Sequence, residues 1–237
     1  PLTAKLFKKI WDESTNAQNI FQIVYGSGKI GNQIVKSPLT DVICFTGSTS
    51  VGKKIAETCA SLFKPSILEL GGKDPMIILD DADINRSVKA AIWGGLSNAG
   101  QTCISVERIF IHEKIFEEVK SKLKEKIELY SSGTDKSLVG AITVDSSLEK
   151  IKSQIDNVRQ HSEIVQGLAE EGPYIAPSLI INPPLDSEIC KRETFGPVIT
   201  IHSFKKDEEA INLANDTGYG LSASVFGKNL KRLKYIS

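Results

Sequence analysis

Alternation of short apolar segments with helix-forming segments is the feature that most constrains the fold of this chain. Residues 41–45 are apolar, the turn 46–52 follows, and helical spacing of apolar residues then continues to Leu62. A second apolar segment covers residues 66–70. Strands that alternate with helices at this spacing predict βαβ units, with a parallel sheet covered on both faces. The chain is therefore predicted to be an α/β protein.

The same periodicities predict the remaining elements. Helices are expected at residues 3–12, 115–130, 146–161 and 207–214, and the closing run 229–237 is amphipathic. Strands are expected at residues 19–25, 76–79, 106–112, 174–181 and 198–204.

Cys103 differs from the other cysteines in its surroundings. A helical stripe of apolar residues runs from Ile84 to Ala99, with Asp83 as its predicted N-cap and Gly100 as a left-handed stop. Because a strand is predicted from residue 106, Cys103 lies in a short helix-to-strand connection among small residues. A nucleophile facing a cleft and a small buried hydrophobe are both open interpretations.

The other three cysteines carry no chemical signal. Cys44 and Cys59 stand in apolar segments and are expected to be buried. Cys190 lies in a polar-flanked loop and receives no role.

Glu69 interrupts an apolar strand. Its side chain is expected on the face opposite Leu68 and Leu70. A carboxylate in a buried strand must be paired, protonated or functional, so a structural ion pair remains an alternative. The adjacent glycines Gly71 and Gly72 allow close approach of a ligand and favour function. Glu69 would then be the base and Cys103 the nucleophile, with both side chains facing one active-site cleft.

Two glycine-rich turns follow predicted strands and open helices, at residues 26–31 and 46–52. Such turns present backbone N–H groups and a positive helix end to phosphate. Each is also compatible with a tight turn that binds nothing. Two of them on successive units favour a nucleotide site at the carboxyl ends of the strands.

Bulk properties exclude several classes of partner. The 237 residues carry 29 basic and 29 acidic side chains, which gives no electrostatic attraction to nucleic acid or anionic membrane. Cysteines without close pairs, no signal peptide and no long apolar run predict a cytoplasmic protein. His112, His161 and His202 fall in unrelated segments, so no metal site is predicted.

Four motifs resemble those of the aldehyde dehydrogenase superfamily, in the same order and at similar spacing. They are Phe45–Gly52, Leu68–Pro75, Asn98–Cys103 and Glu193–Val198. The resemblance extends over the whole chain and implies an incomplete aldehyde dehydrogenase fold. Residues 1–70 would be the C-terminal half of a Rossmann-like NAD(P)-binding domain, and residues 71–237 a catalytic domain truncated at its C-terminus.

The resemblance implies oxidation of an aldehyde to a carboxylate with NAD⁺ or NADP⁺. Cys103 would attack the aldehyde to form a thiohemiacetal, and Glu69 would activate the water that hydrolyses the resulting thioester. The Cys103 N–H would form half of an oxyanion hole. The residues implied in cofactor binding are Gly47 and Ser48 at the pyrophosphate, Val51 near the adenine, Leu70 and Gly71 at the nicotinamide, Glu193 at its ribose and Phe195 beside its ring.

The chain opens with Pro1, has Met76 as its single methionine and closes in an amphipathic run, so we expect a longer parent polypeptide. The resemblance implies that this parent is a homodimer or homotetramer. It also implies that an oxyanion-hole asparagine and a ribose-binding lysine precede the present segment. The chain alone is therefore expected to oxidise aldehydes poorly or not at all.

The segment 98–106 around Cys103 most resembles family members that act on lactaldehyde, glyceraldehyde-type substrates and succinate semialdehyde, and this resemblance implies a small hydroxy- or semialdehyde as substrate. Glu69 favours release as a carboxylate over transfer to coenzyme A, although a coenzyme A-acylating semialdehyde dehydrogenase remains an alternative. A non-catalytic binding or structural module that keeps the fold is the other alternative.

Overall fold

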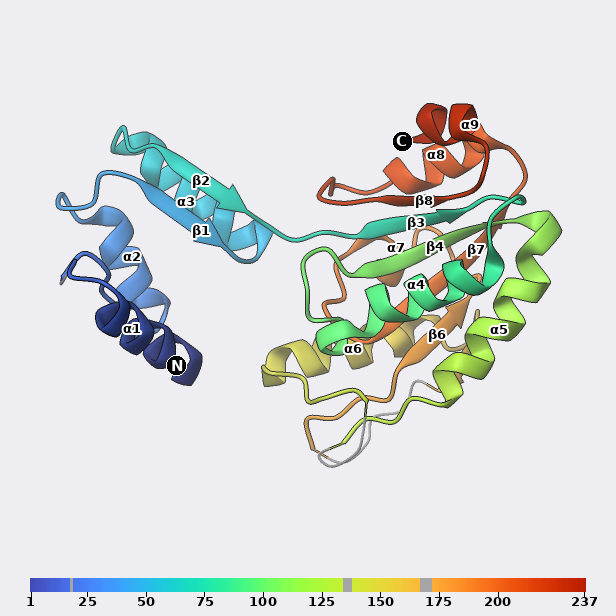
Figure 1. The fold of residues 1–237 in the computed structure, drawn as a ribbon, viewed down its shortest axis with the longest axis horizontal. Helices are drawn as coiled ribbons and strands as arrows, with labels where there is room; N and C mark the ends of the chain where they lie inside the picture. The colour runs from blue at the N-terminus through green and yellow to red at the C-terminus, as the bar shows by residue number, and fades with distance from the viewer. Residues whose placement is uncertain (18, 134–137, 167–171) are drawn as a thin grey trace. The chain divides into compact units, whose positions relative to one another are not determined.

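The computed structural model describes residues 1–17, 19–133, 138–166 and 172–237. It consists of two compact units, Pro1–Leu70 and Gly71–Ser237 (Figure 1). None of the helices in the described ranges combines the length and the apolar character that a bilayer crossing requires.

The first unit contains a parallel strand pair. β1 (Ile43–Thr46) and β2 (Ser66–Glu69) are joined through α3 (Thr49–Ser61), as the sequence predicts. Two helices precede the pair, α1 (Leu2–Ser14) and α2 (Gly28–Lys36).

The buried core of this unit is small. It consists of Val35, Ile43 and Cys59, with Ile55 packed against them. The burial of Cys59 is confirmed, whereas Cys44 is exposed, contrary to the prediction. Successive strand residues face opposite sides, so β1 turns Ile43 inward and Cys44 outward.

Residues 19–25 do not form the predicted strand. Phe21 packs instead against α1, with its ring centroid 5.9 Å from that of Phe7 and 5.7 Å from that of Trp11. Aromatic packing onto a helix has therefore replaced sheet pairing in this segment.

The second unit is organised around a six-stranded sheet in the order β5-β6-β7-β4-β3-β8. Neighbouring strands are parallel except for the antiparallel pair β5 and β6. The strands are β3 (Asp74–Ile78), β4 (Val106–His112), β5 (Glu163–Gln166), β6 (Ser178–Ile181), β7 (Val198–Phe204) and β8 (Ser224–Phe226).

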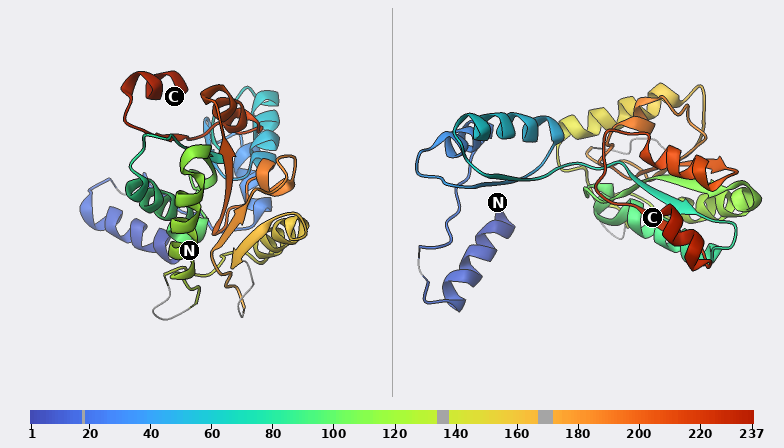
Figure 2. Two further views of the ribbon diagram at one scale, coloured as in Figure 1. Left: turned by 90° about the vertical axis from the view of Figure 1, so that its right-hand side faces the viewer. Right: turned by 90° about the horizontal axis from the view of Figure 1, so that it is seen from above.

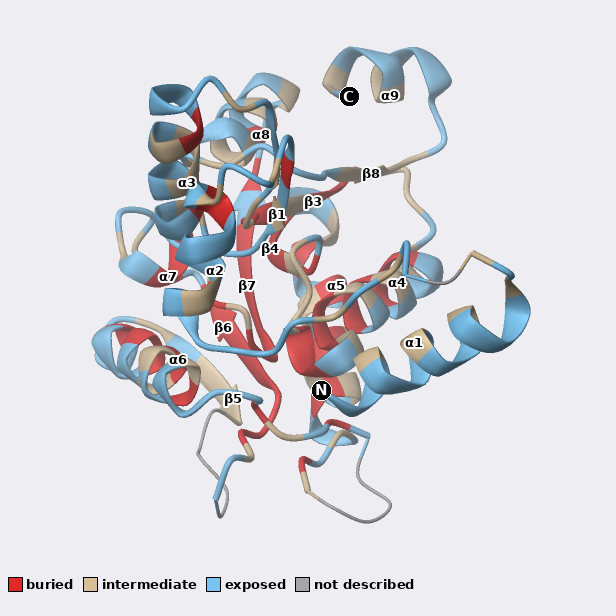
Figure 3. Cartoon of the chain, turned by 90° about the vertical axis from the view of Figure 1, so that its left-hand side faces the viewer, coloured by how far each residue is buried: buried red, intermediate tan, exposed pale blue. Residues whose placement is uncertain are grey.

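Helices cover both faces of this sheet (Figure 2). Their bounds are α4 (Ile84–Leu96), η1 (Ser97–Gly100), η2 (Glu113–Ile115), α5 (Phe116–Glu128), α6 (Asp145–Val158), α7 (Glu188–Lys191), α8 (Asp207–Asn215) and α9 (Leu230–Ile236). Ile109 and Ile111 of β4 pack with α4 and α5, and Phe110 between them packs with α8. The central strands are accordingly buried (Figure 3).

The strongest predictions concern the central strands. Those at residues 106–112 and 198–204 are confirmed residue for residue. The strand expected at 174–181 begins at Ser178, and the short strands β5 and β8 at the sheet edges were not predicted. Cys190 lies in α7 and is buried, whereas a polar loop was expected, because Ile189 and Cys190 pack with residues of α6.

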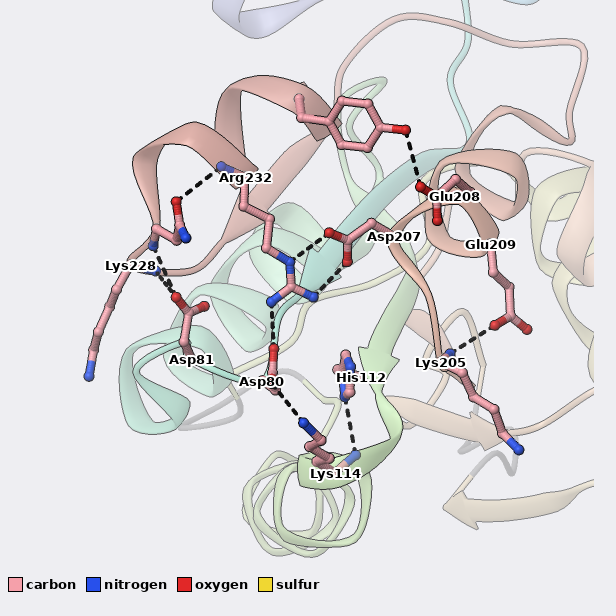
Figure 4. A network of polar contacts seen from close by, with 12 residues as sticks. Asp80, Asp81, His112, Lys114, Lys205, Asp207, Glu208, Glu209, Lys228 and Arg232 are labelled. Carbon is pink, nitrogen blue, oxygen red and sulfur yellow. Dashed lines mark hydrogen bonds and ion pairs between the residues drawn. The ribbon is translucent and has the colours of Figure 1, made fainter.

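A polar network fixes α9 (Figure 4). Arg232 donates to both carboxylate oxygens of Asp207, at 2.7 and 2.6 Å, and to Asp80 at 2.5 Å. Asp81 accepts from the N–H groups of Lys228 and Asn229, just before the helix. The guanidinium group of Arg232 thus joins α9 to the start of α8 and to Asp80, the second residue after β3.

Candidate functional site

The turn that carries Cys103 has an unusual backbone. Asp83 caps α4 as predicted, accepting from the Arg86 N–H at 3.0 Å. After the helix ends, Asn98, Ala99 and Gly100 have φ angles of 53°, 57° and 68°. The sequence predicts a left-handed residue at Gly100 alone. Three successive left-handed residues redirect the chain sharply, and Cys103 then lies partly exposed in the turn before β4.

Glycines bring this turn against two other loops of the second unit. A Cβ atom at Gly100 would lie 2.0 Å from the Gly196 carbonyl oxygen, and one at Gly72 would lie 2.4 Å from the Cys103 carbonyl oxygen. Such contacts are possible for glycine alone. The loops 71–73, 97–105 and 193–197 therefore converge around Cys103.

Glu193 faces the glycine pair. Its Oε1 accepts from the Gly72 N–H at 3.2 Å, and a Cβ atom at Gly71 would lie 2.6 Å from the same oxygen. Burial raises the pKa of Glu193, and the hydrogen bond from Gly72 opposes that rise. The structure thus brings together four residues predicted from the sequence: Cys103, Gly71, Glu193 and, two residues further along the same loop, Phe195.

A buried ion pair behind these loops was not predicted. Lys73 pairs with Glu107, and the two side chains are 0% and 3% exposed. Glu107 lies in β4 and accepts from the N–H groups of Thr194, at 2.9 Å, and Phe195, at 3.0 Å. Burial lowers the pKa of Lys73, while Glu107 opposes this. Glu107 is, like Glu69, a carboxylate within a predicted strand, but Arg108 follows it directly, so the signal of a lone charge is weaker there.

Glu69 differs from its prediction in burial. It ends β2 in the first unit, and its side chain is exposed, whereas a buried strand was expected. The pair β1 and β2 forms a two-stranded sheet, so this position lacks the cover that a larger sheet would give. The Glu69 carbonyl oxygen accepts from the Gly47 N–H at 3.0 Å. Leu70 is the last residue of the same unit.

The first unit has a pocket with a volume of about 660 Å³. This volume lies within the range of roughly 300–1,000 Å³ that is typical of small-molecule sites. It lies between α2, α3 and β1 and is lined in part by Gly28, Gly31, Val51 and Thr58. Ser48 caps α3 by accepting from the Val51 N–H at 3.4 Å. Gly28 and Gly31 come from the first glycine-rich turn and Val51 from the second, so both turns border this region.

Asp74 provides a test of stability against pH. Its Oδ2 is buried without a hydrogen-bond partner among the described residues, and burial raises its pKa to about 6. This pKa exceeds the value of about 3.9 in the unfolded chain, so protonation of Asp74 favours the folded state. Its contribution to the free energy of unfolding is complete below about pH 4 and is lost as the pH rises through 6. The loss should reach about 3 kcal/mol. Urea unfolding of Asp74→Asn between pH 4 and 7 should lack this fall, whereas the exposed Asp186→Asn should keep it; equal profiles would contradict the prediction.

The fold and the site define an α/β protein with a cysteine at the meeting point of glycine-rich loops. The model of the aldehyde dehydrogenase family matches residues 1–237, and the chain belongs to this family.

Relatives and solved structures agree with this assignment. The chain is 36% identical to betaine aldehyde dehydrogenase 1 of Oryza sativa subsp. japonica, over 92% of this chain and 45% of that protein. It is 32% identical to the NADP⁺-dependent succinate-semialdehyde dehydrogenase of Escherichia coli, over 90% and 46%. The crystal structure of lactaldehyde dehydrogenase from Escherichia coli matches with a TM-score of 0.94 and 32% identity, over 100% and 51%. The chain thus spans about half the length of these relatives.

Proposed function

We propose that this protein oxidises an aldehyde to a carboxylate with NAD⁺ or NADP⁺, using Cys103 as the nucleophile. The observation that supports this most directly is the convergence of the loops 71–73 and 193–197 on the turn of Cys103. These loops leave the thiol partly exposed while backbone contacts at Gly72 and Gly100 fix its turn. A fixed and accessible thiol is what attack on a carbonyl carbon requires.

In the proposed reaction, the Cys103 sulfur forms a bond to the aldehyde carbon, giving a thiohemiacetal, and the Cys103 N–H stabilises the oxyanion. A bound dinucleotide supplies the oxidant by accepting a hydride. The thioester left on Cys103 is then hydrolysed, with Glu69 as the base that takes a proton from the attacking water. The exposed side chain of Glu69 is able to exchange that proton with solvent.

The residues proposed to hold the dinucleotide fall in both units. The 660 Å³ pocket beside Val51 has the size and lining suited to an adenine moiety. The N-terminus of α3, with Ser48, suits a pyrophosphate. The Gly47 N–H already donates to the Glu69 carbonyl oxygen. We therefore propose that Gly47 lets the chain turn closely beside the pyrophosphate, and that Ser48 makes the direct contact with the phosphate oxygens.

Four further residues are proposed for the nicotinamide end. They are Leu70 and Gly71 beside the ring, Glu193 at the ribose and Phe195 near the ring. A half-buried carboxylate that faces two glycines suits a sugar hydroxyl pair, because the glycines leave room and the carboxylate accepts.

The substrate is proposed to be a small hydroxy- or semialdehyde. This choice agrees with the names of relatives that act on lactaldehyde and succinate semialdehyde. We further propose a homodimer or homotetramer for the protein.

Alkylation by iodoacetamide tests the nucleophile. Cys103 is expected to react faster than the exposed Cys44, although it is less accessible, and much faster than the buried Cys59. Peptide mass spectrometry over a time course measures each rate. Equal rates for Cys103 and Cys59 would favour the non-catalytic module.

A further inference from the structure

We propose that Glu107 is a positioning residue for dinucleotide binding: by accepting the N–H groups of Thr194 and Phe195 it orients Glu193 toward the nicotinamide ribose. This inference rests on the proposed function, since it takes Glu193 as the ribose contact. It assigns to the carboxylate in β4 a role separate from its charge.

The hydrogen bonds of Glu107 exceed what a counter-ion needs. Neutralising Lys73 requires one carboxylate oxygen close to the ammonium group, which Oε2 provides. Oε1 accepts in addition from the Thr194 N–H at 3.1 Å and from the Phe195 N–H at 3.0 Å. Two consecutive N–H groups that point to one carboxylate fix the backbone immediately after Glu193.

The fixed segment has a strained conformation. Phe195 has a φ angle of 55°, which costs a bulky side chain about 1–2 kcal/mol. A residue keeps such a conformation when its surroundings enforce it, and strain of this kind gathers at functional sites. The hydrogen bond from Phe195 to Glu107 supplies that enforcement.

Lys73 extends the arrangement to the facing loop. It follows Gly71 and Gly72 directly, and its ammonium group donates to Thr194 Oγ1 at 3.0 Å as well as to Glu107. The buried Lys73–Glu107 pair therefore holds both loops of the Glu193–Gly72 contact: Lys73 belongs to the loop of Gly72, and Glu107 binds the loop of Glu193.

Two matched double variants separate positioning from charge balance. Lys73→Met with Glu107→Gln removes both charges but keeps an oxygen that can accept from Thr194 and Phe195. Lys73→Met with Glu107→Met removes both charges and the acceptor. Neither leaves a buried charge unpaired, which is the change that would unfold the protein. Thermal unfolding verifies that both are folded before binding is measured.

The measurement is calorimetric titration of the protein, expressed from its complete open reading frame, with NAD⁺, NADP⁺ and AMP. We expect the glutamine variant to bind the preferred dinucleotide within about threefold of the unsubstituted protein, and the methionine variant to bind it at least tenfold more weakly. AMP has no nicotinamide ribose, so its affinity should be equal in all three proteins. Glu193→Gln should weaken dinucleotide binding in the unsubstituted protein and have little further effect in the methionine variant.

The outcomes distinguish this inference from the proposed function. Equal dinucleotide affinities in the two double variants, or a loss of AMP binding that parallels the loss of dinucleotide binding, would overturn the positioning role alone. If the methionine variant does not fold while the glutamine variant does, hydrogen exchange of the Thr194 and Phe195 amides in the folded glutamine variant decides. Amide protection and dinucleotide affinity that both stay near those of the unsubstituted protein support positioning through the backbone, and affinity that stays while protection is lost contradicts it. Absence of NAD⁺ and NADP⁺ binding by the unsubstituted protein would overturn the proposed function and this inference together.

Discussion

Replacing Cys103 by serine is expected to lower the rate of aldehyde oxidation by about 10⁴-fold or more, since loss of a covalent nucleophile removes the reaction path itself. The assay follows NADH or NADPH absorbance with a panel of small hydroxy- and semialdehydes, using the protein from its complete open reading frame. Cys59→Ala is the matched control, because Cys59 lies in α3 of the first unit, outside the loops 71–73, 97–105 and 193–197, and should retain near-normal turnover.

More than a tenth of the original rate in Cys103→Ser would contradict the assignment of the nucleophile. The same assay identifies the product. A carboxylate formed without coenzyme A agrees with Glu69 as the base, whereas a thioester formed when coenzyme A is added would indicate the acylating alternative.

Gly100→Ala is expected to lower the free energy of unfolding by about 2–5 kcal/mol, from the cost of a left-handed alanine together with overpacking. The added Cβ would meet the Gly196 carbonyl oxygen, a backbone atom that has no rotamer to change. Urea denaturation measures the loss.

Gly140→Ala is the control for this substitution. Its Cβ would have nothing within 4 Å, so a change below about 0.5 kcal/mol is expected. If both variants lost the same stability, the proposed close approach of the loops 97–105 and 193–197 would be incorrect.

The sequence predicts the fold best where apolar residues are most concentrated. β4 and β7 lie in the middle of the sheet, and their β-branched and aromatic residues give a strand signal that spans seven positions each. β8 has three residues at an edge and leaves almost none. The segment 19–25 carries a strand-like pattern, but Phe21 packs on α1 instead, a tertiary contact that local periodicity does not contain.

The sequence motifs identify the residues that form the candidate site, but they do not identify the buried Lys73–Glu107 pair that packs behind it. Cys103, Gly71 and Glu193 lie in recognisable segments, and the structure brings these three together. The contacts of Lys73 join residues 34 and 121 positions apart, which no local pattern shows. A catalytic or binding residue must be of a particular type, which a local motif reveals. A supporting residue depends on contacts between distant parts of the chain, which only the tertiary structure reveals.

The approach of Gly72 to the Cys103 carbonyl oxygen has a consequence for directed evolution of this protein. Because main-chain atoms meet there, a library that randomises Gly72 or Gly100 should yield almost no folded members, however the neighbouring side chains vary. Changes of substrate preference are better sought at positions whose side chains border the thiol than in the loops that hold it. The loop backbone around the Cys103 sulfur therefore tolerates few substitutions, whereas the side chains that surround the thiol can be varied.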